Sequence, residues 1–346
     1  MSKIISFIIP SYNVEHCLEN VLKSMLHENC LKETEIIVVN DGSQDRTAEI
    51  AERYVSSYPD SVKLINKVNG GHGSAINIGT EAVSGKYFKV IDADDWVLTD
   101  NLLSFIITLK QCNADVVLTP YHQVSIVSGK KYNCMMHCES YNIEYSMNEV
   151  LEKWECFKHC LTFHGITYKS SFYRRHYHKL PEKIFYEDQE YAAIPCCHAS
   201  SIYPINLHIY QYLIDNGDQS VSDVNRVKQI RHVEQVTRNM LEYGIQNSEL
   251  LPAGKEYLYR KEEEIILSYF VIACLIQEDK QRGRIDFKDY KQMIKEVEPY
   301  IYKRIYSKSC LYSFMNRIHL PYKTYQFIIR SKLYSLMRKK HRIERV

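Results

Sequence analysis

The chain has 346 residues, enough for one large domain and a smaller one. Its 45% hydrophobic and 25% charged residues are typical of a globular protein with a sizeable core. The net charge is +2, but residues 299–346 carry twelve Lys/Arg and one acid, whereas the rest of the chain has a net charge of −9. A basic tail of this kind favours an anionic partner.

The composition argues against export and membrane insertion. The N-terminal MSKIISFIIPSYN has a short apolar run without a cleavage-site pattern, so we expect a strand rather than a signal peptide. The longest apolar stretch, residues 265–276, is shorter than the roughly 18 residues that a membrane span requires. Eleven cysteines without a signal fit a reducing compartment. We therefore expect a cytoplasmic protein.

The first hundred residues alternate apolar runs with amphipathic segments. The runs at 4–9, 35–40, 62–65 and 87–91 predict buried strands, and the i, i+3, i+4 stripes between them predict helices, the first capped by Asn13. Such repeats predict an α/β fold with a mostly parallel sheet and right-handed crossovers. Farther along, residues 115–121 predict another strand and residues 125–138 a hairpin.

Polar residues follow each of the first four predicted strands, at 12–13, 41, 69–74 and 92–95. The carboxyl ends of parallel strands share one edge of a sheet, where α/β folds bind ligands, so this pattern predicts a nucleotide site. The glycine-rich loop at 69–74 is not a Gly-x-Gly-x-x-Gly after the first strand and contains no Gly-Lys-Ser/Thr. Dinucleotide and P-loop sites are therefore disfavoured.

The fourth strand, in KYFKVIDADD, ends on three carboxylates. By strand alternation, Asp92 and Asp94 would point one way and Asp95 the other. Ionised carboxylates this close repel one another, and either a divalent cation or a raised pKa relieves the repulsion. Two interpretations stay open here, a metal that holds a phosphate or a solvated acidic turn.

Four ordered motifs lie after these strands: PSYNVE at 10–15, NDGSxD at 40–45, NxGxxxAxNxG at 69–79 and DxDD at 92–95. Together they closely resemble the family 2 glycosyltransferases over roughly the first 120 residues, and more loosely to about residue 220. The resemblance implies a GT-A fold, a Rossmann-like sheet with flanking helices. From residue 223 onward, helical periodicity predicts an α-helical C-terminal region.

The resemblance also implies a nucleoside diphosphate sugar as donor. Tyr12, Asp41 and Asn69 would hold the base, usually uracil, and Asp92 the ribose. Asp94, with Asp92, would ligate Mn²⁺ or Mg²⁺ that bridges the diphosphate. The implied donor-binding residues are Pro10, Tyr12, Asp41, Asn69, Gly71 and Asp92.

One position departs from the family pattern. Ile76 stands where many members have an arginine. Either His72 and the amides at the helix start replace the lost contact, or His72 is structural.

The segment FYEDQ at 185–189 resembles the Glu-Asp pair of the family, in which the aspartate is the base. The resemblance therefore implies that Asp188 is the catalytic base and that Glu187 orients it or contacts the acceptor. Acids also favour helix starts without any catalysis. Gln219 and Ser220 are further candidates for contact with the diphosphate.

We expect a GT-A catalytic domain at residues 1–222 and a helical region at 223–346. Within the first, residues 1–120 form the nucleotide-sugar and metal half and residues 121–222 the acceptor half. The tail 299–346 has an apolar stripe, Tyr322, Tyr325, Ile329, Leu333 and Leu336, beside basic residues that include Arg338. It either lies on an anionic membrane, peripherally on the inner face, or packs as a helical bundle. RNA binding is a weaker third alternative, and we expect no nucleic-acid partner.

Two cysteine segments, 134–138 and 156–160, repeat Cys-x-x-His-Cys without the usual paired Cys-x-x-Cys spacing of zinc sites. Buried free cysteines are the more common explanation.

The resemblance therefore implies an inverting, metal-dependent transferase that moves one sugar from a nucleoside diphosphate sugar, with UDP as the expected nucleotide. The acceptor would be a hydroxyl of a glycan or of a lipid-linked precursor in surface polysaccharide synthesis. Without membrane spans or a Gln-x-x-Arg-Trp motif, a processive synthase is disfavoured. The alternatives are a catalytically silent nucleotide-sugar binding or scaffold protein and a nucleotidyltransferase.

Overall fold

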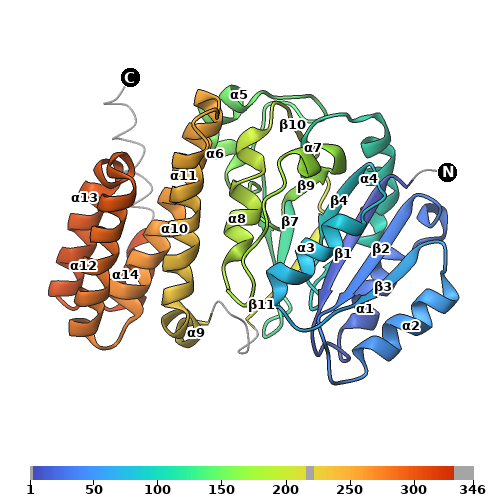
Figure 1. Cartoon of the computed structure of the whole chain (residues 1–346), viewed down its shortest axis with the longest axis horizontal. Helices are drawn as coiled ribbons and strands as arrows, with labels where there is room; N and C mark the ends of the chain where they lie inside the picture. Colours follow the sequence, from blue (N-terminus) through green and yellow to red (C-terminus); the bar gives the residue numbers. More distant parts are fainter. Residues whose placement is uncertain (1–2, 216–221, 331–346) are drawn as a thin grey trace. The chain divides into compact units, whose positions relative to one another are not determined.

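The computed structural model describes residues 3–215 and 222–330, and the chain divides into two compact units (Figure 1). The first unit comprises residues 1–219 and 247–258, and the second comprises residues 220–246 and 259–346. The described elements before residue 216 are β1 (Ile5–Ser11), α1 (Leu18–Met25), η1 (Glu28–Cys30), β2 (Thr34–Asn40), α2 (Thr47–Ser57), β3 (Val62–Asn66), α3 (His72–Ala82), β4 (Tyr87–Val90), β5 (Trp96–Val97), α4 (Thr99–Gln111), β6 (Val116–Leu118), β7 (Tyr121–Ser125), β8 (Lys131–Cys134), α5 (Met147–Glu152), α6 (Trp154–Phe157), β9 (Ile166–Lys169), α7 (Ser170–Arg175), α8 (Glu187–Ala193), η2 (Cys196–His198), β10 (Ile202–Pro204) and β11 (Tyr210–Ile214).

A seven-stranded sheet of order β10-β6-β9-β4-β1-β2-β3 forms the centre of the first unit. β1 is parallel to β2 and β4, and β2 is parallel to β3, whereas β9 is antiparallel to both of its neighbours. Every residue of β1 and β2 is buried, so both faces of these strands are covered, as in other parallel sheets. The predicted α/β fold with a mostly parallel sheet is confirmed.

The parallel register brings the ends of the first strands together. Ser11 of β1 pairs with Asn40 of β2, which pairs with Asn66 of β3. The loops that follow these strands and β4 therefore begin at one edge of the sheet. Helix α3, whose start lies after the glycine-rich loop, packs closely on β1, where Gly79 leaves no room for a Cβ beside Ile8.

Two local predictions are wrong. The strand expected at 115–121 is split between β6 in the large sheet and β7 in a four-stranded sheet of order β5-β11-β7-β8. Pro120 lies at the break and has no N–H for a ladder hydrogen bond. Asn13 does not cap the first helix, since α1 begins at Leu18 and Asn13 has a left-handed φ of 53°. The hairpin expected at 125–138 is present but shifted toward the N-terminus, since antiparallel β7 and β8 pair from Tyr121 to Cys134.

After residue 222 the described chain is helical, as predicted. The elements are α9 (Asp223–Lys228), α10 (Ile230–Gln246), α11 (Pro252–Val271), the π-helical η3 (Ile272–Ile276), α12 (Lys280–Val297), α13 (Pro299–Arg317) and α14 (Tyr322–Arg330). In the core of the second unit the rings of Tyr269 and Tyr290 stack with centroids 3.6 Å apart, and the hydroxyl of Tyr290 hydrogen-bonds Thr237 at 2.7 Å.

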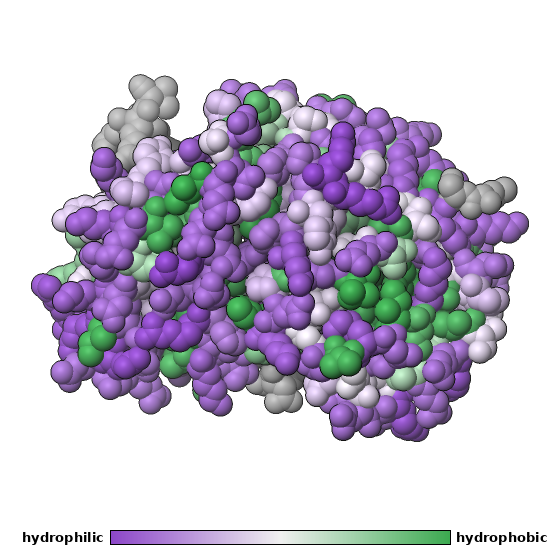
Figure 2. All heavy atoms as spheres, in the orientation of Figure 1, coloured by the Kyte–Doolittle hydropathy of each residue, from purple (hydrophilic) through white to green (hydrophobic). Residues whose placement is uncertain are grey.

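Within residues 3–215 and 222–330, no helix is both long and apolar enough to cross a bilayer. On the face drawn in Figure 2, hydrophobic residues form separate patches between hydrophilic ones.

Candidate active site

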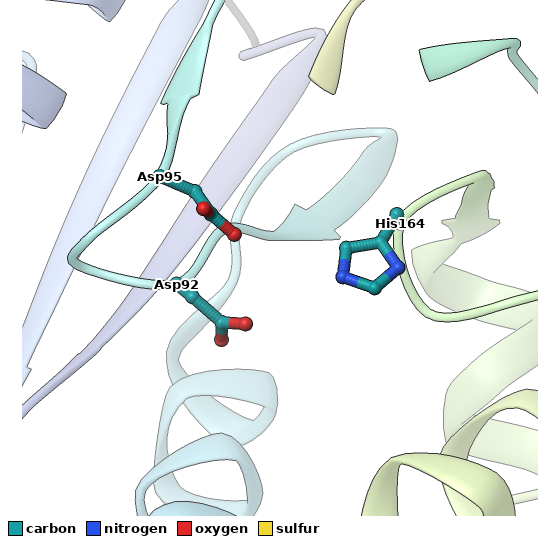
Figure 3. A group of neighbouring side chains, drawn as sticks. All are labelled: Asp92, Asp95 and His164. Carbon is teal, nitrogen blue, oxygen red and sulfur yellow. The ribbon is translucent and has the colours of Figure 1, made fainter. Parts of the chain in front are cut away.

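The acidic segment after β4 is a turn. Pairing of the strand continues to Ile91, and the amide of Asp95 then donates to the carbonyl of Asp92 at 3.0 Å. Strand alternation therefore does not extend through the three aspartates, and the prediction that Asp95 points away from Asp92 is wrong. Figure 3 shows the carboxylates of Asp92 and Asp95 and the imidazole of His164 directed toward one another. One ligand atom of each residue lies within 4.8 Å of the others.

Asp95 is fixed by β11. The hydroxyl of Tyr210 donates to Asp95 Oδ2 at 2.5 Å and accepts from the amide of Asp92 at 3.1 Å. The amide of Leu213 donates to Asp95 Oδ1 at 2.7 Å. One tyrosine thus locks the shape of the acidic turn, a role that the sequence analysis missed.

The turn is electrostatically crowded. Burial, followed by repulsion from Asp92, raises the pKa of Asp94 to about 6. Burial, followed by repulsion from Asp92 and Asp94, raises the pKa of Asp95 well above its ordinary value. A hard cation with oxygen ligands would remove this repulsion, so the residues present fit a divalent metal ion.

His72, the first residue of α3, bridges two carboxylates. Its Nε2 lies 2.9 Å from Asp92 Oδ1, and its Nδ1 lies 2.5 Å from Glu187 Oε1. Burial alone would lower the pKa of His72, but the charges and hydrogen bonds of Asp92 and Glu187 raise it well above its ordinary value. Burial alone would raise the pKa of Asp92, but His72 lowers it. His72 therefore carries a positive charge that links the acidic turn to α8.

The predicted base lies at the start of α8, after Tyr186 in a left-handed conformation (φ 71°). Glu187 is 4% exposed, and the half-buried Asp188 accepts a hydrogen bond from Gln189 Nε2 at 3.1 Å. Burial, followed by repulsion from Glu187, raises the pKa of Asp188 to about 6. A carboxylate with this pKa is ionised near neutral pH and still basic enough to accept a proton.

The segment before Asp188 is attached to α3. The side-chain amide of Asn77 donates to the carbonyl of Leu180 at 2.9 Å and accepts from its amide at 3.0 Å. The amide of Lys183 donates to the carbonyl of Gly70 at 2.8 Å. Gly73 faces the carbonyl of Pro181, 2.5 Å from where a Cβ would lie. These contacts hold the segment that leads to Asp188, the predicted catalytic base, beside the glycine-rich loop.

Asp41 stabilises that loop. Its carboxylate accepts from the amides of Gly70 and Gly71 at 2.9 and 2.7 Å and from Lys67 Nζ at 2.6 Å. The side chain of Asn69 donates to the carbonyl of Asp41 at 3.0 Å. Gly71 has a φ of 86°, which favours glycine, and a Cβ there would meet the amide of Lys183 at 2.9 Å. The carboxylate of Asp41 thus holds the glycine-rich loop in place, in addition to its predicted contact with the base of the nucleotide.

The other predicted donor residues lie at the same edge of the sheet. Tyr12 follows β1 and is 50% exposed, as an aromatic face that stacks on a base must be. Asn69 is exposed after β3, whereas Pro10 is buried within β1. Gln219 and Ser220 lie outside the described residues.

Lys89 was also missed, although a lysine within the apolar run YFKVI was a visible signal. Its side chain is fully buried in β4, and Nζ donates to the carbonyls of His164 and Ile166 at 2.7 and 2.9 Å. Burial lowers the pKa of Lys89 to about 7. The strand that leads into the acidic turn therefore also anchors the segment that carries His164.

Within residues 3–215 and 222–330, the side chains of the two Cys-x-x-His-Cys segments do not converge as a set of metal ligands. Among the residues that the structure describes, the only group of three or more potential ligands that converges is Asp92, Asp95 and His164. Cys160 is buried and its thiol contacts the carbonyl of Cys134 at 3.7 Å. These cysteines pack as free thiols.

Comparison with known proteins finds relatives in sequence and in fold. The uncharacterized glycosyltransferase EpsJ of Bacillus subtilis is 42% identical over 97 residues, which cover 28% of each chain, so the match spans less than a third of this relative. The structure of TarS residues 1–349 from Staphylococcus aureus in complex with UDP-GlcNAc has a TM-score of 0.66 at 18% identity and covers 96% of this chain and 92% of that one.

The mannosyltransferase PcManGT of Pyrobaculum calidifontis, in complex with GDP-Man and Mn²⁺, has a TM-score of 0.54 at 13% identity and covers 95% of this chain and 84% of that one. These likenesses confirm the predicted GT-A fold. Residues 6–188, just over half of the chain, match the family described as Glycosyl transferase family 2. The chain belongs to glycosyl transferase family 2.

Proposed function

We propose that this protein is an inverting, metal-dependent glycosyltransferase. It takes one sugar from a nucleoside diphosphate sugar, with UDP as the expected nucleotide, and moves it to a hydroxyl of a glycan or lipid-linked acceptor in surface polysaccharide synthesis. The observation that carries the proposal is the bridge from Asp92 through His72 to Glu187, because it joins the acidic turn to the helix of the predicted base. The UDP-GlcNAc complex of TarS and the GDP-Man and Mn²⁺ complex of PcManGT support the donor class and the cation.

On the donor side, Tyr12 stacks on the base, and Asp41 and Asn69 form hydrogen bonds with its edge. Pro10 and Gly71 shape the backbone around the nucleotide, and Asp92 holds the ribose. Asp94 and Asp92 would hold Mn²⁺ or Mg²⁺, which would supply charge neutralisation for the leaving diphosphate.

On the acceptor side, Asp188 accepts the proton of the attacking hydroxyl at a carboxylate oxygen. The new bond forms between the acceptor oxygen and the anomeric carbon as the bond from that carbon to the diphosphate oxygen breaks, on the opposite face. A single displacement of this kind inverts the anomeric centre. Glu187 is neutralised by His72, which holds α8 in register with the acidic turn.

Donor binding and turnover separate this function from its alternatives. A panel of nucleotide sugars is screened by thermal shift with and without Mn²⁺, where a true donor at a hundredfold excess over Kd should stabilise the protein by about 2.7 kcal/mol. With acceptor present, a transferase releases nucleoside diphosphate. Donor binding without release in any acceptor mixture would indicate a silent binding protein, and release of pyrophosphate from a nucleoside triphosphate would indicate a nucleotidyltransferase.

For the C-terminal tail we propose association with an anionic membrane. Exposed Phe314 and Phe327 lie on α13 and α14, which also carry basic residues, a composition typical of interfacial helices. Within the predicted stripe, however, the hydroxyl of Tyr325 hydrogen-bonds that of Tyr312 at 2.7 Å, so part of the stripe packs within the second unit. Leu333, Leu336 and Arg338 lie outside the described residues.

Sedimentation with phosphatidylglycerol vesicles tests this part of the proposal. Binding should fall as salt rises, since screening shortens the reach of surface charge. Equal binding to neutral phosphatidylcholine vesicles would contradict it.

A further inference from the structure

His164 faces the acidic turn and has no role in the predicted machinery. It lies between α6 and β9, and one of its ring nitrogens is within 4.8 Å of a carboxylate oxygen of Asp92 and of Asp95 (Figure 3). Two ligands on opposite sides of a small divalent cation are about 4–5 Å apart, which is twice a typical metal–oxygen bond. The imidazole is therefore close enough to share one ion with the carboxylates.

The ring is held by aromatic neighbours but lacks polar partners. It stacks on Tyr212 with centroids 4.2 Å apart, and the rings of Tyr210 and Tyr121 lie 4.9 and 5.1 Å away. Within the described parts of the chain, neither ring nitrogen makes a hydrogen bond. Because the ring is only half-buried, its unpaired nitrogens stay open to a ligand in the space that it faces.

The chemistry of His164 also suits a metal ligand. Imidazole is the commonest side-chain ligand of transition-metal ions, and it binds them through a ring nitrogen. His72, in contrast, uses both ring nitrogens on Asp92 and Glu187.

The backbone around His164 is fixed independently of any ion. Lys89 donates to the carbonyls of His164 and Ile166 from β4, the strand that ends in the acidic turn. On the opposite side, Tyr210 and Leu213 hold Asp95. The imidazole and the carboxylates are thus preorganised by rigid strands, as a metal site requires.

We infer that His164 is a protein ligand of the divalent cation in this site, and that its nitrogen makes the site prefer Mn²⁺ over Mg²⁺. The inference rests on the proposed function in one respect, namely that a divalent cation binds at this site. Mg²⁺ prefers oxygen ligands and water, whereas first-row transition-metal ions such as Mn²⁺ also bind imidazole nitrogen. Asp92 and Asp95 supply the carboxylate oxygens nearest to His164, and hydrogen bonds from β11 hold Asp95 in place.

Pulsed electron paramagnetic resonance of the full chain with Mn²⁺ and UDP tests the inference. A ¹⁴N coupling from a directly bound imidazole should appear in the wild type and disappear in His164→Gln. His164→Phe is the second variant, because it keeps an aromatic ring against Tyr212 while removing both nitrogens. His122→Gln is the matched control, since His122 stacks on His208 and hydrogen-bonds Gln211 outside the cluster.

Affinity gives a second readout. Loss of His164 should weaken Mn²⁺ binding by at least about 10-fold, the lower end of what loss of an outer-shell partner costs, and should change Mg²⁺ binding less. Persistence of the ¹⁴N coupling in both His164 variants, or its loss in His72→Gln instead, would overturn the inference while leaving the proposed function intact. If the wild type binds neither Mn²⁺ nor UDP, the proposed function fails as well.

Discussion

The site is built from two regions that are held in different ways. The loops after β1 to β4 hold one another locally, as where the carboxylate of Asp41 accepts hydrogen bonds from Gly70 and Gly71. The segment 160–215 is held by long-range contacts, from Lys89 to the carbonyl of His164 and from Tyr210 to Asp95. Residues of the local loops lie in short motifs that can be recognised in the sequence. Residues joined by long-range contacts belong to no such motif, so the sequence does not identify them.

The largest expected effect tests the base in the second region. Asp188→Asn preserves shape but removes the proton acceptor, so kcat should fall by roughly 10²–10⁴-fold while donor affinity changes little. Steady-state kinetics and calorimetric donor binding measure the two quantities. Asp100→Asn, an exposed change in the first turn of α4, is the control. Equal kcat for Asp188→Asn and wild type would exclude Asp188 as the base.

The second-largest effect is expected for His72, which links the two regions through Asp92 and Glu187. His72→Gln leaves the buried carboxylate of Glu187 and the half-buried carboxylate of Asp92 without their shared cation, and hydrogen bonds to charged groups contribute about 1.5–3 kcal/mol. We expect kcat to fall by roughly 10- to 100-fold, since 1.4 kcal/mol corresponds to about tenfold. His72→Lys retains the charge and should recover part of the loss. If Gln and Lys variants behave alike, the charge of His72 is not what couples the regions.

The sequence analysis succeeded for site residues that lie directly after a predicted strand. Apolar runs located β1 to β4, and parallel pairing then required Asp41, Asn69 and Asp92 to share an edge. It failed where the chain leaves regular structure, because the turn after Ile91 brings Asp95 back toward Asp92.

Nothing local distinguishes His164 or Tyr210 from core aromatics, so their positions emerge only from the packing of β9 and β11. His72 was a candidate, but its two carboxylate partners lie 20 and 115 residues away. No pattern in the sequence links residues so far apart.

A smaller effect concerns pH. Asp188 must be ionised to accept a proton, and its pKa is raised to about 6, so kcat/KM should rise with pH up to about 6 and then level off. Below that value the rate should fall about tenfold per pH unit. Rates measured from pH 4.5 to 8 provide the test, with metal and donor saturation verified at each pH. A rate that is flat from pH 8 to pH 5 would contradict the raised pKa.

The smallest expected effect concerns Lys89. Lys89→Met removes both hydrogen bonds to the His164 segment, so Mn²⁺ affinity should fall by less than the roughly 10- to 100-fold expected for a direct outer-shell partner. Burial lowers the pKa of Lys89 to about 7, below the unfolded value of about 10.4, so the folded state binds fewer protons between these values. Wild-type stability relative to Lys89→Met should therefore rise with pH across this window.

Urea unfolding at pH 7 and pH 9 measures that difference. Lys23→Met, at an exposed position in α1 that pairs with Glu19, is the control for removal of a surface lysine. A pH-independent difference between Lys89→Met and wild type would mean that Lys89 stays charged when buried.

The most direct test of the account is calorimetric titration of UDP into the wild type, Asp94→Asn and Asp188→Asn, each with Mn²⁺ and with EDTA. If the acidic turn holds a cation for the diphosphate, wild type and Asp188→Asn should bind UDP only with Mn²⁺, and Asp94→Asn should bind at least about 10-fold more weakly. UDP binding to the wild type that EDTA leaves unchanged would contradict the account.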